Sequence, residues 1–306
     1  MVHVPRGLAE RAYRSDRNPD RLGDNFSSWL TASNKRDDIM GDEVSSLSND
    51  GRITTEKIGH IFLIVIDRPK KLNGFSVKML AELGRAFSAM EGDSDIRCGV
   101  LCAEGRNFTA GLELNQVAKH LAKGPLFPED NVDPVNLHGR LRTKPLVSAV
   151  QGICFTLGIE LMLASDIVIA ASDCRFAQIE VKRGIMPSAG ATIRMTERAG
   201  LGNALRYLLT GDEFNAETAL RLGFVQEVVA PGSERQRAIE IATLISEQAP
   251  LAVAATLANA RKAVFEGPNA AAAQLQKEQR RLQASEDAEE GVRSFIEKRP
   301  AKFLGR

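Results

Sequence analysis

The chain has 306 residues, enough for one large domain or two small ones with a sizeable core. Its 40 lysines and arginines almost balance 39 aspartates and glutamates, which removes the electrostatic basis of a general nucleic-acid binder. Aromatic residues make up only 5%, so stacking platforms for single-stranded nucleic acid are not expected either.

No segment has the pattern of a membrane span. The most apolar long stretch, residues 148–172, is interrupted by Gln151, Glu160 and Asp166. The first residues lack an uninterrupted apolar run and carry acids among their arginines, unlike a secretory signal or a transit peptide. We therefore expect a soluble, cytoplasmic protein that contacts neither membrane nor nucleic acid.

Residues 1–50 differ in composition from the rest of the chain. They are rich in Arg, Asp, Ser and Asn and contain only short apolar clusters. This pattern predicts a largely disordered N-terminal extension, with Met40 as an alternative natural start. The domain proper is then residues 51–306, with a core over 51–230 and a helical C-terminal region over 231–306.

From residue 60 the chain alternates strand and helix patterns, which predicts an α/β fold. Short apolar runs predict strands at 60–67, 98–102, 146–150 and 166–170. Apolar residues at helical spacing predict a helix at 76–90, with Ser76 as its cap, and a buried helix at 157–164. After residue 188 helices dominate, and we expect them at 192–198, 203–209, 216–222, 234–247, 251–265 and 270–284.

Several common chemistries lack their residues here. The four cysteines form no CxxC pair and lie in apolar stretches, which is typical of buried reduced thiols. The four histidines do not cluster with acids or thiols at metal-ligand spacings, so no metal site is expected. GxSxG, GxGxxG and GxxxxGK[ST] are all absent, which disfavours a serine hydrolase and the usual phosphate-binding loops.

Two carboxylates stand in stretches that otherwise look buried, Glu160 and Glu180. One interpretation is an ion pair, because burying an unpartnered carboxylate is costly and Lys182, Arg183 or Arg194 could neutralise either one. The other is acid–base chemistry, since burial and a neighbouring carboxylate raise a pKa toward neutrality.

Turns of small residues near these glutamates can present backbone N–H groups to a cavity. One is Thr109-Ala110-Gly111, and the other is the loop before Gly158. Two such donors would form an oxyanion hole, and the N-terminus of the helix that carries Glu160 would add its dipole.

Three segments together resemble the enoyl-CoA hydratase/isomerase (crotonase) family. The family's signatures are an R-P-x-x-x-N turn, an F-x-x-G-x-D loop, and a G…E…D-I run that leads to E…P-G-x-G-G-T. The corresponding segments here are residues 68–75 (RPKKLNGF), 106–114 (RNFTAGLEL), and 151–166 with 176–192. The resemblance covers about residues 55–306.

This resemblance implies a spiral of ββα units with a helical region that trimerises, often as a dimer of trimers. It implies an acyl-CoA thioester substrate and no cofactor beyond the coenzyme A that the substrate carries. It assigns the oxyanion hole to the N–H groups of Ala110 and Leu157. It also assigns Glu160 and Glu180 to the two glutamates that activate one water in hydratases.

The resemblance further implies a set of residues around the substrate. Lys70 and Lys71 match the coenzyme A site, although lysines also commonly face solvent, and Lys298 matches a position that reaches a neighbouring subunit's coenzyme A. The complete predicted substrate-binding set is Lys70, Lys71, Leu72, Thr109, Gly111, Leu112, Gly158, Pro187, Ser188, Phe295 and Lys298.

The chain departs from the family pattern at several positions. Leu157 replaces a glycine, Glu113 replaces the aspartate of G-x-D, and Ser188 and Ala191 replace glycines. Glu113 is either structural or a third carboxylate, and we favour the structural role. The stretch 115–143 reads as a long loop that shapes the acyl pocket.

Hydration of a trans-2-enoyl-CoA is the first expectation, because both glutamates are present. A double-bond isomerase that uses the later glutamate alone is the nearest alternative. A thioester hydrolase, a decarboxylase and a non-catalytic acyl-CoA-binding protein of the same fold remain open.

Overall fold

A computed structural model describes residues 50–306 except residue 123. The predicted N-terminal extension, with Met40, lies outside the described residues. The described residues form one compact unit.

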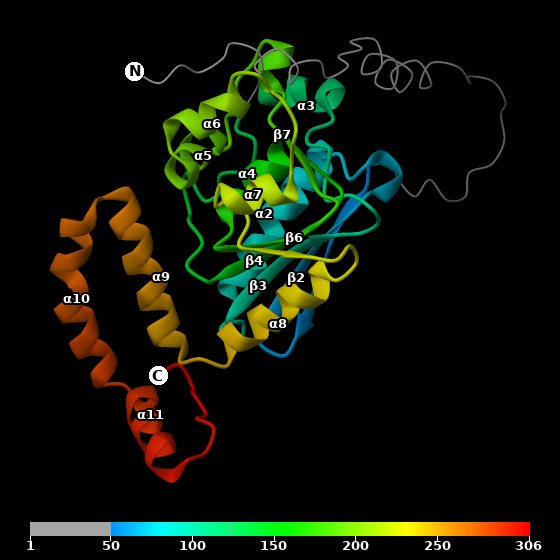
Figure 1. Cartoon of the computed structure of the whole chain (residues 1–306). Helices are drawn as coiled ribbons and strands as arrows, with labels where there is room; N and C mark the ends of the chain where they lie inside the picture. Colours follow the sequence, from blue (N-terminus) through cyan, green and yellow to red (C-terminus); the bar gives the residue numbers. More distant parts are fainter. Residues whose placement is uncertain (1–49, 123) are drawn as a thin grey trace, which may run out of the picture. The chain divides into compact units, whose positions relative to one another are not determined.

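A six-stranded sheet forms the centre, in the order β1-β2-β3-β4-β6-β9 (Figure 1). Its strands are Arg52–Ile58, Ile61–Asp67, Cys98–Ala103, Leu146–Val150, Ile167–Ala171 and Glu227–Val229. The first pair is antiparallel, and the remaining neighbours are parallel. A second sheet, β5-β7-β8, contains Ile153–Phe155, Arg175–Ala177 and Phe214–Asn215.

Both faces of the central sheet are covered, which explains why β2 and β3 read as continuous apolar runs. On β2, Phe62, Ile64 and Ile66 face the larger core, which includes residues of α2 (Val77–Gly92) and α4 (Leu157–Ala164). The alternate residues of β2 face α8 (Glu234–Ser246), where Ala238 and Ala242 are fully buried. Figure 1 shows α8 lying along the sheet.

The predicted helices are present within one or two residues of their expected ends. Ser76 caps α2, because its hydroxyl accepts a hydrogen bond from the Met79 amide. The later predicted helices are α5 (Ala191–Ala199), α6 (Leu201–Leu208), α7 (Ala216–Arg221), α8, α9 (Pro250–Phe265) and α10 (Pro268–Gln283).

The structure adds two helices that the sequence analysis did not expect. The helix α3 (Leu114–Leu121) occupies the start of the stretch expected to be a loop, and α11 (Glu286–Glu297) follows the acidic run after residue 284. Two short 3-10 helices, η2 (Pro69–Lys71) and η3 (Glu180–Arg183), lie in the signature segments.

Helices α8 to α11 account for most of the chain from Glu234 to Glu297, and α10 packs against both α9 and α11 (Figure 1). Within the described residues no single helix is long and apolar enough to span a membrane, although α8 and α9, bent by 109° where they meet, pass that test as a pair.

Candidate active site

Glu160 lies in the first turn of α4, whose eight residues are all buried. Its side chain is 4% exposed, and Oε1 accepts hydrogen bonds from the amides of Ala189 (2.7 Å) and Ala191 (3.2 Å). Burial raises the pKa of Glu160, while the two amides and the charge of Arg194 act in the opposite direction.

Glu180 opens η3 and has a different environment. Its Oε2 is buried and has no hydrogen-bond partner in the described part of the chain. Burial raises its pKa to about 7, and the negative charge of Glu160 adds to the rise. The two carboxyl groups are therefore near enough to interact. The backbone amide of Glu180 lowers the pKa of its own side chain, whereas in the described chain Glu160 has two donors from other residues and a cation.

The ion-pair interpretation of these glutamates is not what the structure shows. No salt bridge joins Glu160 or Glu180 to any side chain within residues 50–306, the one undescribed position aside. Arg194 acts on Glu160 through its charge only, and its hydrogen bonds go elsewhere.

The loop at 109–113 lies directly against the start of α4. Thr109 forms a parallel bridge with Cys154 of β5, the strand that leads into this helix. A Cβ at Gly111 would overlap the Thr156 hydroxyl, and one at Gly158 would lie 2.7 Å from Cγ2 of Thr109. Gly111 also has φ of 98°, a left-handed conformation that favours glycine. Small residues are therefore required on both sides of this contact.

The structure corrects the predicted oxyanion donor on this loop. The Ala110 N–H already donates to the Leu72 carbonyl at 2.9 Å, so it is not available to a substrate. Leu112 is the central residue of a parallel bridge with Phe75. The Phe75 N–H donates to the Gly111 carbonyl, and the Glu113 N–H donates to the Phe75 carbonyl. In such a bridge the N–H of the central residue points away from the partner strand.

The amides of Leu112 and Leu157 are both open. Neither N–H has a hydrogen-bond acceptor in the described part of the chain. Leu157 is the first residue of α4, where no intrahelical carbonyl is available to its amide. The contacts of Gly111 and Gly158 bring the two segments together, which makes these amides the better candidate pair.

The R-P-x-x-x-N turn is fixed to the same loop by buried polar contacts. Arg68 is 7% exposed and pairs with Glu113 at 2.7 Å. Asn73 accepts from the Arg68 amide and donates to the carbonyls of Glu104 and Asn107. These contacts favour the structural role of Glu113, because its carboxylate is already paired and holds the two signature segments together.

The remaining predicted substrate residues fall into two groups. Lys70, Lys71 and Leu72 belong to the turn around η2, and Pro187 and Ser188 precede the amides that bind Glu160, with Pro187 buried and Ser188 exposed. Phe295 and Lys298 lie at the end of α11, where Phe295 is 85% exposed. Among the described residues, no hydrogen bond or ion pair joins this second group to the glutamates, and α11 packs against α10.

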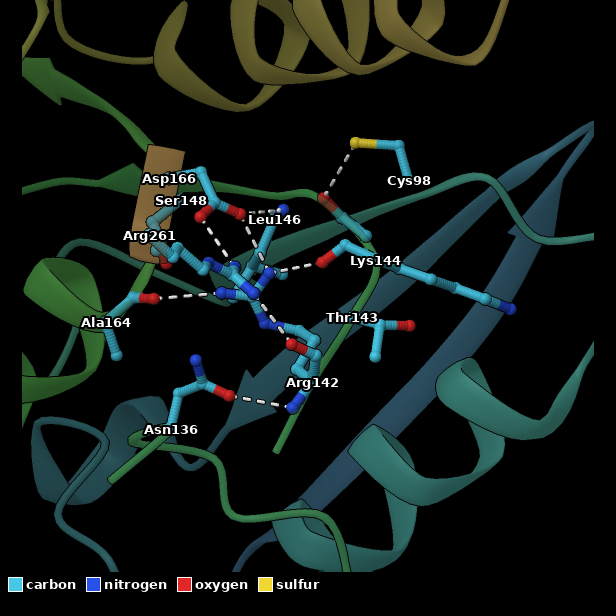
Figure 2. Close-up of polar contacts among 12 residues, drawn as sticks. Cys98, Asn136, Arg142, Thr143, Lys144, Leu146, Ser148, Ala164, Asp166 and Arg261 are labelled. Atoms are coloured by element: carbon cyan, nitrogen blue, oxygen red, sulfur yellow. Dashed lines mark hydrogen bonds and ion pairs between the residues drawn. The ribbon is translucent and has the colours of Figure 1, made fainter. Parts of the chain in front are cut away.

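A cluster of arginines and one aspartate holds the far end of α4 (Figure 2). Arg142 is 2% exposed and donates to the carbonyl of Ala164 and to Asp166 Oδ2 (2.8 Å). Arg261 of α9 binds the other oxygen of Asp166 at 2.7 Å and the Arg142 carbonyl at 2.7 Å. This cluster joins the C-terminal helices to the helix that bears Glu160.

Comparison with known proteins bears on the identity of this site. The family model for enoyl-CoA hydratase/isomerase matches residues 56–306. The chain belongs to the enoyl-CoA hydratase/isomerase family.

Named relatives and a solved structure agree with this membership. The enoyl-CoA hydratase EchA19 of Mycobacterium tuberculosis is 32% identical over 82% of this chain and 96% of its own length. The 2,3-dehydroadipyl-CoA hydratase of Escherichia coli is 31% identical over 80% and 96%. A crystal structure of a probable enoyl-CoA hydratase/isomerase from Mycobacterium abscessus superposes with a TM-score of 0.80 and is 48% identical in sequence. The match covers 83% of this chain and 98% of that one. The crotonase-like fold expected from the sequence is confirmed.

Two features of this family member's site escaped the sequence analysis. The Leu112 amide was missed as a donor because the direction of an N–H depends on strand pairing, which the motif does not encode. Arg194 was considered only as an ion-pair partner. The signal available in the sequence was its spacing from Arg198. Arginines four residues apart lie on the same face of a helix, here α5.

Proposed function

We propose that this chain is an enoyl-CoA hydratase, which adds water across the 2,3 double bond of a trans-2-enoyl-CoA. The observation that carries the proposal is the pair Glu160 and Glu180. Their carboxyl groups interact, but backbone amides and a nearby cation stabilise the negative charge of Glu160, whereas a buried oxygen of Glu180 has no donor in the described chain. A water molecule that adds across a double bond must lose one proton, and the substrate must gain one. Paired carboxyls in different environments suit these two tasks.

The Leu112 and Leu157 amides would bind the thioester oxygen. Negative charge develops on this oxygen as water attacks the β carbon and the α carbon becomes part of an enolate. Preorganised N–H donors in a buried site contribute roughly 3 to 4 kcal/mol each to such a transition state. Leu157 also opens α4, so the helix dipole favours the same charge.

The environments of the glutamates support a different role for each. Glu160, held by two amides and faced by a cation, acts as the carboxylate that takes a proton from water. The water oxygen bonds to the β carbon, and the electrons of the double bond move to the enolate. Glu180, with its pKa near 7, acts as the acid that protonates the α carbon. The product is a 3-hydroxyacyl-CoA, and proton exchange with solvent restores both glutamates.

The proposal includes the substrate contacts and the assembly. Lys70 and Lys71 would attract the coenzyme A phosphates, and no cofactor other than the substrate's own coenzyme A is required. Phe295 and Lys298 would act on a neighbouring subunit in a homotrimer or hexamer. Cytoplasmic location belongs to the same proposal.

The test is turnover of crotonyl-CoA in water labelled with oxygen-18. We expect loss of the conjugated enoyl-thioester absorbance and a 3-hydroxy product that carries one labelled oxygen. Migration of the double bond without label would indicate an isomerase, and release of free coenzyme A a hydrolase. Binding without any turnover of short, long or aromatic enoyl thioesters would indicate an acyl-CoA-binding protein. Sedimentation velocity on the same sample tests the trimer or hexamer, and a monomer would reject it.

A further inference from the structure

Arg194 is a buried cation whose part in the proposed reaction is the charge that it presents to Glu160. It lies on α5, three residues after Ala191, and its side chain is 5% exposed. Burial lowers its pKa to about 10, so the guanidinium stays charged at neutral pH. A buried charge is costly unless its surroundings compensate it.

One nitrogen of Arg194 binds a loop that is distant in sequence. Nη2 donates to the carbonyls of Val135 (2.6 Å) and Asn136 (3.2 Å). We call residues 133–138 the anchored loop. Within it, Asp133 accepts hydrogen bonds from the amides of Val135, Leu137 and His138. The loop is thus ordered from within and attached to α5 by one side chain.

The other nitrogen faces the turn that holds Glu160. Nη1 is buried and has no hydrogen-bond partner in the described residues, and a Cβ at Gly190 would overlap it. Gly190 stands between Ala189 and Ala191, the two residues whose amides bind Glu160. Leu137 of the anchored loop lies against the same glycine. The guanidinium therefore touches the anchored loop and the turn at once.

The charge of Arg194 is also the one cation that acts on Glu160 in the described part of the chain, where it lowers the pKa of this glutamate. Other cations on the surrounding elements serve other groups. Arg198 binds the carbonyls of Leu163 and Ser165, and Arg142 binds that of Ala164, all at the far end of α4. The remaining charged or titratable groups on the elements around Glu160 are Glu180, Lys182 and Arg183 on η3, Glu197 on α5, Asp133 and His138 on the anchored loop, Cys154 on β5, and Glu113 with Arg68.

We propose that Arg194 is a positioning residue that couples the anchored loop to Glu160. It fixes the loop on the turn whose amides bind the carboxylate, and its positive charge favours the ionised form of Glu160. The coupling deepens the proposed function and rests on it for its catalytic meaning, because a hydratase needs one glutamate in each state.

The test separates the charge of Arg194 from its anchoring role. Arg194→Met and Arg194→Gln remove the charge, whereas Arg194→Lys keeps it and loses the two-carbonyl contact. Arg198→Met is the matched control, since it removes a neighbouring arginine that binds α4 carbonyls without acting on Glu160. The ionisation of Glu160 is read by infrared difference spectra, each variant against the same variant with Glu160→Gln, as a function of pH.

We expect both neutral variants to shift the Glu160 titration upward, because an opposite charge nearby favours the carboxylate. The acidic limb of kcat/KM should shift with it. Arg194→Lys should leave the titration in place but speed amide exchange in the anchored loop. Arg198→Met should move neither the titration nor the exchange of this loop.

An unchanged Glu160 titration in Arg194→Gln, or an equal shift in Arg198→Met, would overturn the coupling. The infrared readout does not depend on turnover. If the wild type shows no hydration but the Arg194 variants still shift the Glu160 titration, the proposed function is rejected and the coupling is established.

Discussion

At the scale of single residues, the two glutamates differ because their oxygens meet different partners. Glu160 receives two backbone N–H groups, which stabilise a carboxylate. Glu180 has a buried oxygen without a donor in the described chain and faces the charge of Glu160, which stabilises the protonated form. The asymmetry arises from the local backbone, since both residues are the same amino acid.

The pH dependence of turnover follows from this asymmetry. Glu180 must carry a proton to act as the acid, and its raised pKa of about 7 means that this proton is lost as the pH rises through neutrality. We expect kcat/KM for crotonyl-CoA to fall above about pH 7, by about tenfold per pH unit. Measured rates that stay flat well into the alkaline range would contradict the acid role of Glu180.

The sequence indicated which residues form the candidate site, but not which backbone N–H groups are free within it. Both glutamates and the two small-residue loops could be located from spacing and apolar context. The change from Ala110 to Leu112 could not, because it depends on which N–H the Leu72 carbonyl occupies. Leu72 and Asn73 both have left-handed backbone angles, which a sequence without glycine at these positions does not reveal.

At the scale of elements, the site depends on the close approach of the 109–113 loop to α4. Gly158 and Gly202 form a matched pair, since each follows a leucine as the second residue of its helix. A Cβ at Gly158 would press on Thr109, whereas one at Gly202 meets open space.

Alanine at these two positions should therefore have opposite consequences. We expect Gly158→Ala to displace the loop and lower kcat about tenfold or more, because misplaced oxyanion donors lose transition-state stabilisation. Gly202→Ala should keep full activity and gain up to about 1 kcal/mol of stability from helix propensity. Equal kcat values for the two variants, measured with crotonyl-CoA, would contradict the proposed contact.

The far end of α4 makes a separate prediction about stability. Asp166→Asn would leave the buried guanidinium of Arg142 without its counter-charge, which costs about 3–5 kcal/mol in comparable pairs. Asp212→Asn is the control, because its ion pair with Arg206 is about half exposed and such pairs contribute about 0–1 kcal/mol. Urea unfolding of both variants checks this, and similar losses would show that the Arg142 cluster is not a structural anchor.

The elements missed from the sequence have identifiable causes. The acidic run at the start of α11 was read as a break between helices. Its acids occupy the first helical turn, where they favour the dipole, and Ser285 caps the helix by accepting from Ala288. The short strands of the second sheet have two or three residues each, too few for a periodic pattern.

At the scale of the whole molecule, the C-terminal helices are tied to the end of α4 that lies away from the two glutamates. Arg261 ties α9 to Asp166, whereas Phe295 and Ile296 on α11 are 85% and 72% exposed. Large apolar side chains at such exposure are typical of surfaces that pack on another chain. This agrees with a proposed assembly in which Phe295 and Lys298 serve a neighbouring subunit's substrate.

The two-glutamate mechanism is tested most directly by turnover of Glu160→Gln and Glu180→Gln beside the wild type, with crotonyl-CoA as substrate and binding of a saturated acyl-CoA as the control. Glutamine keeps the size of each side chain and removes its acid–base chemistry. We predict that each variant loses about 10²-fold or more in kcat while its affinity for the acyl-CoA and its melting temperature stay close to wild type. Near-wild-type hydration by either variant would contradict the account.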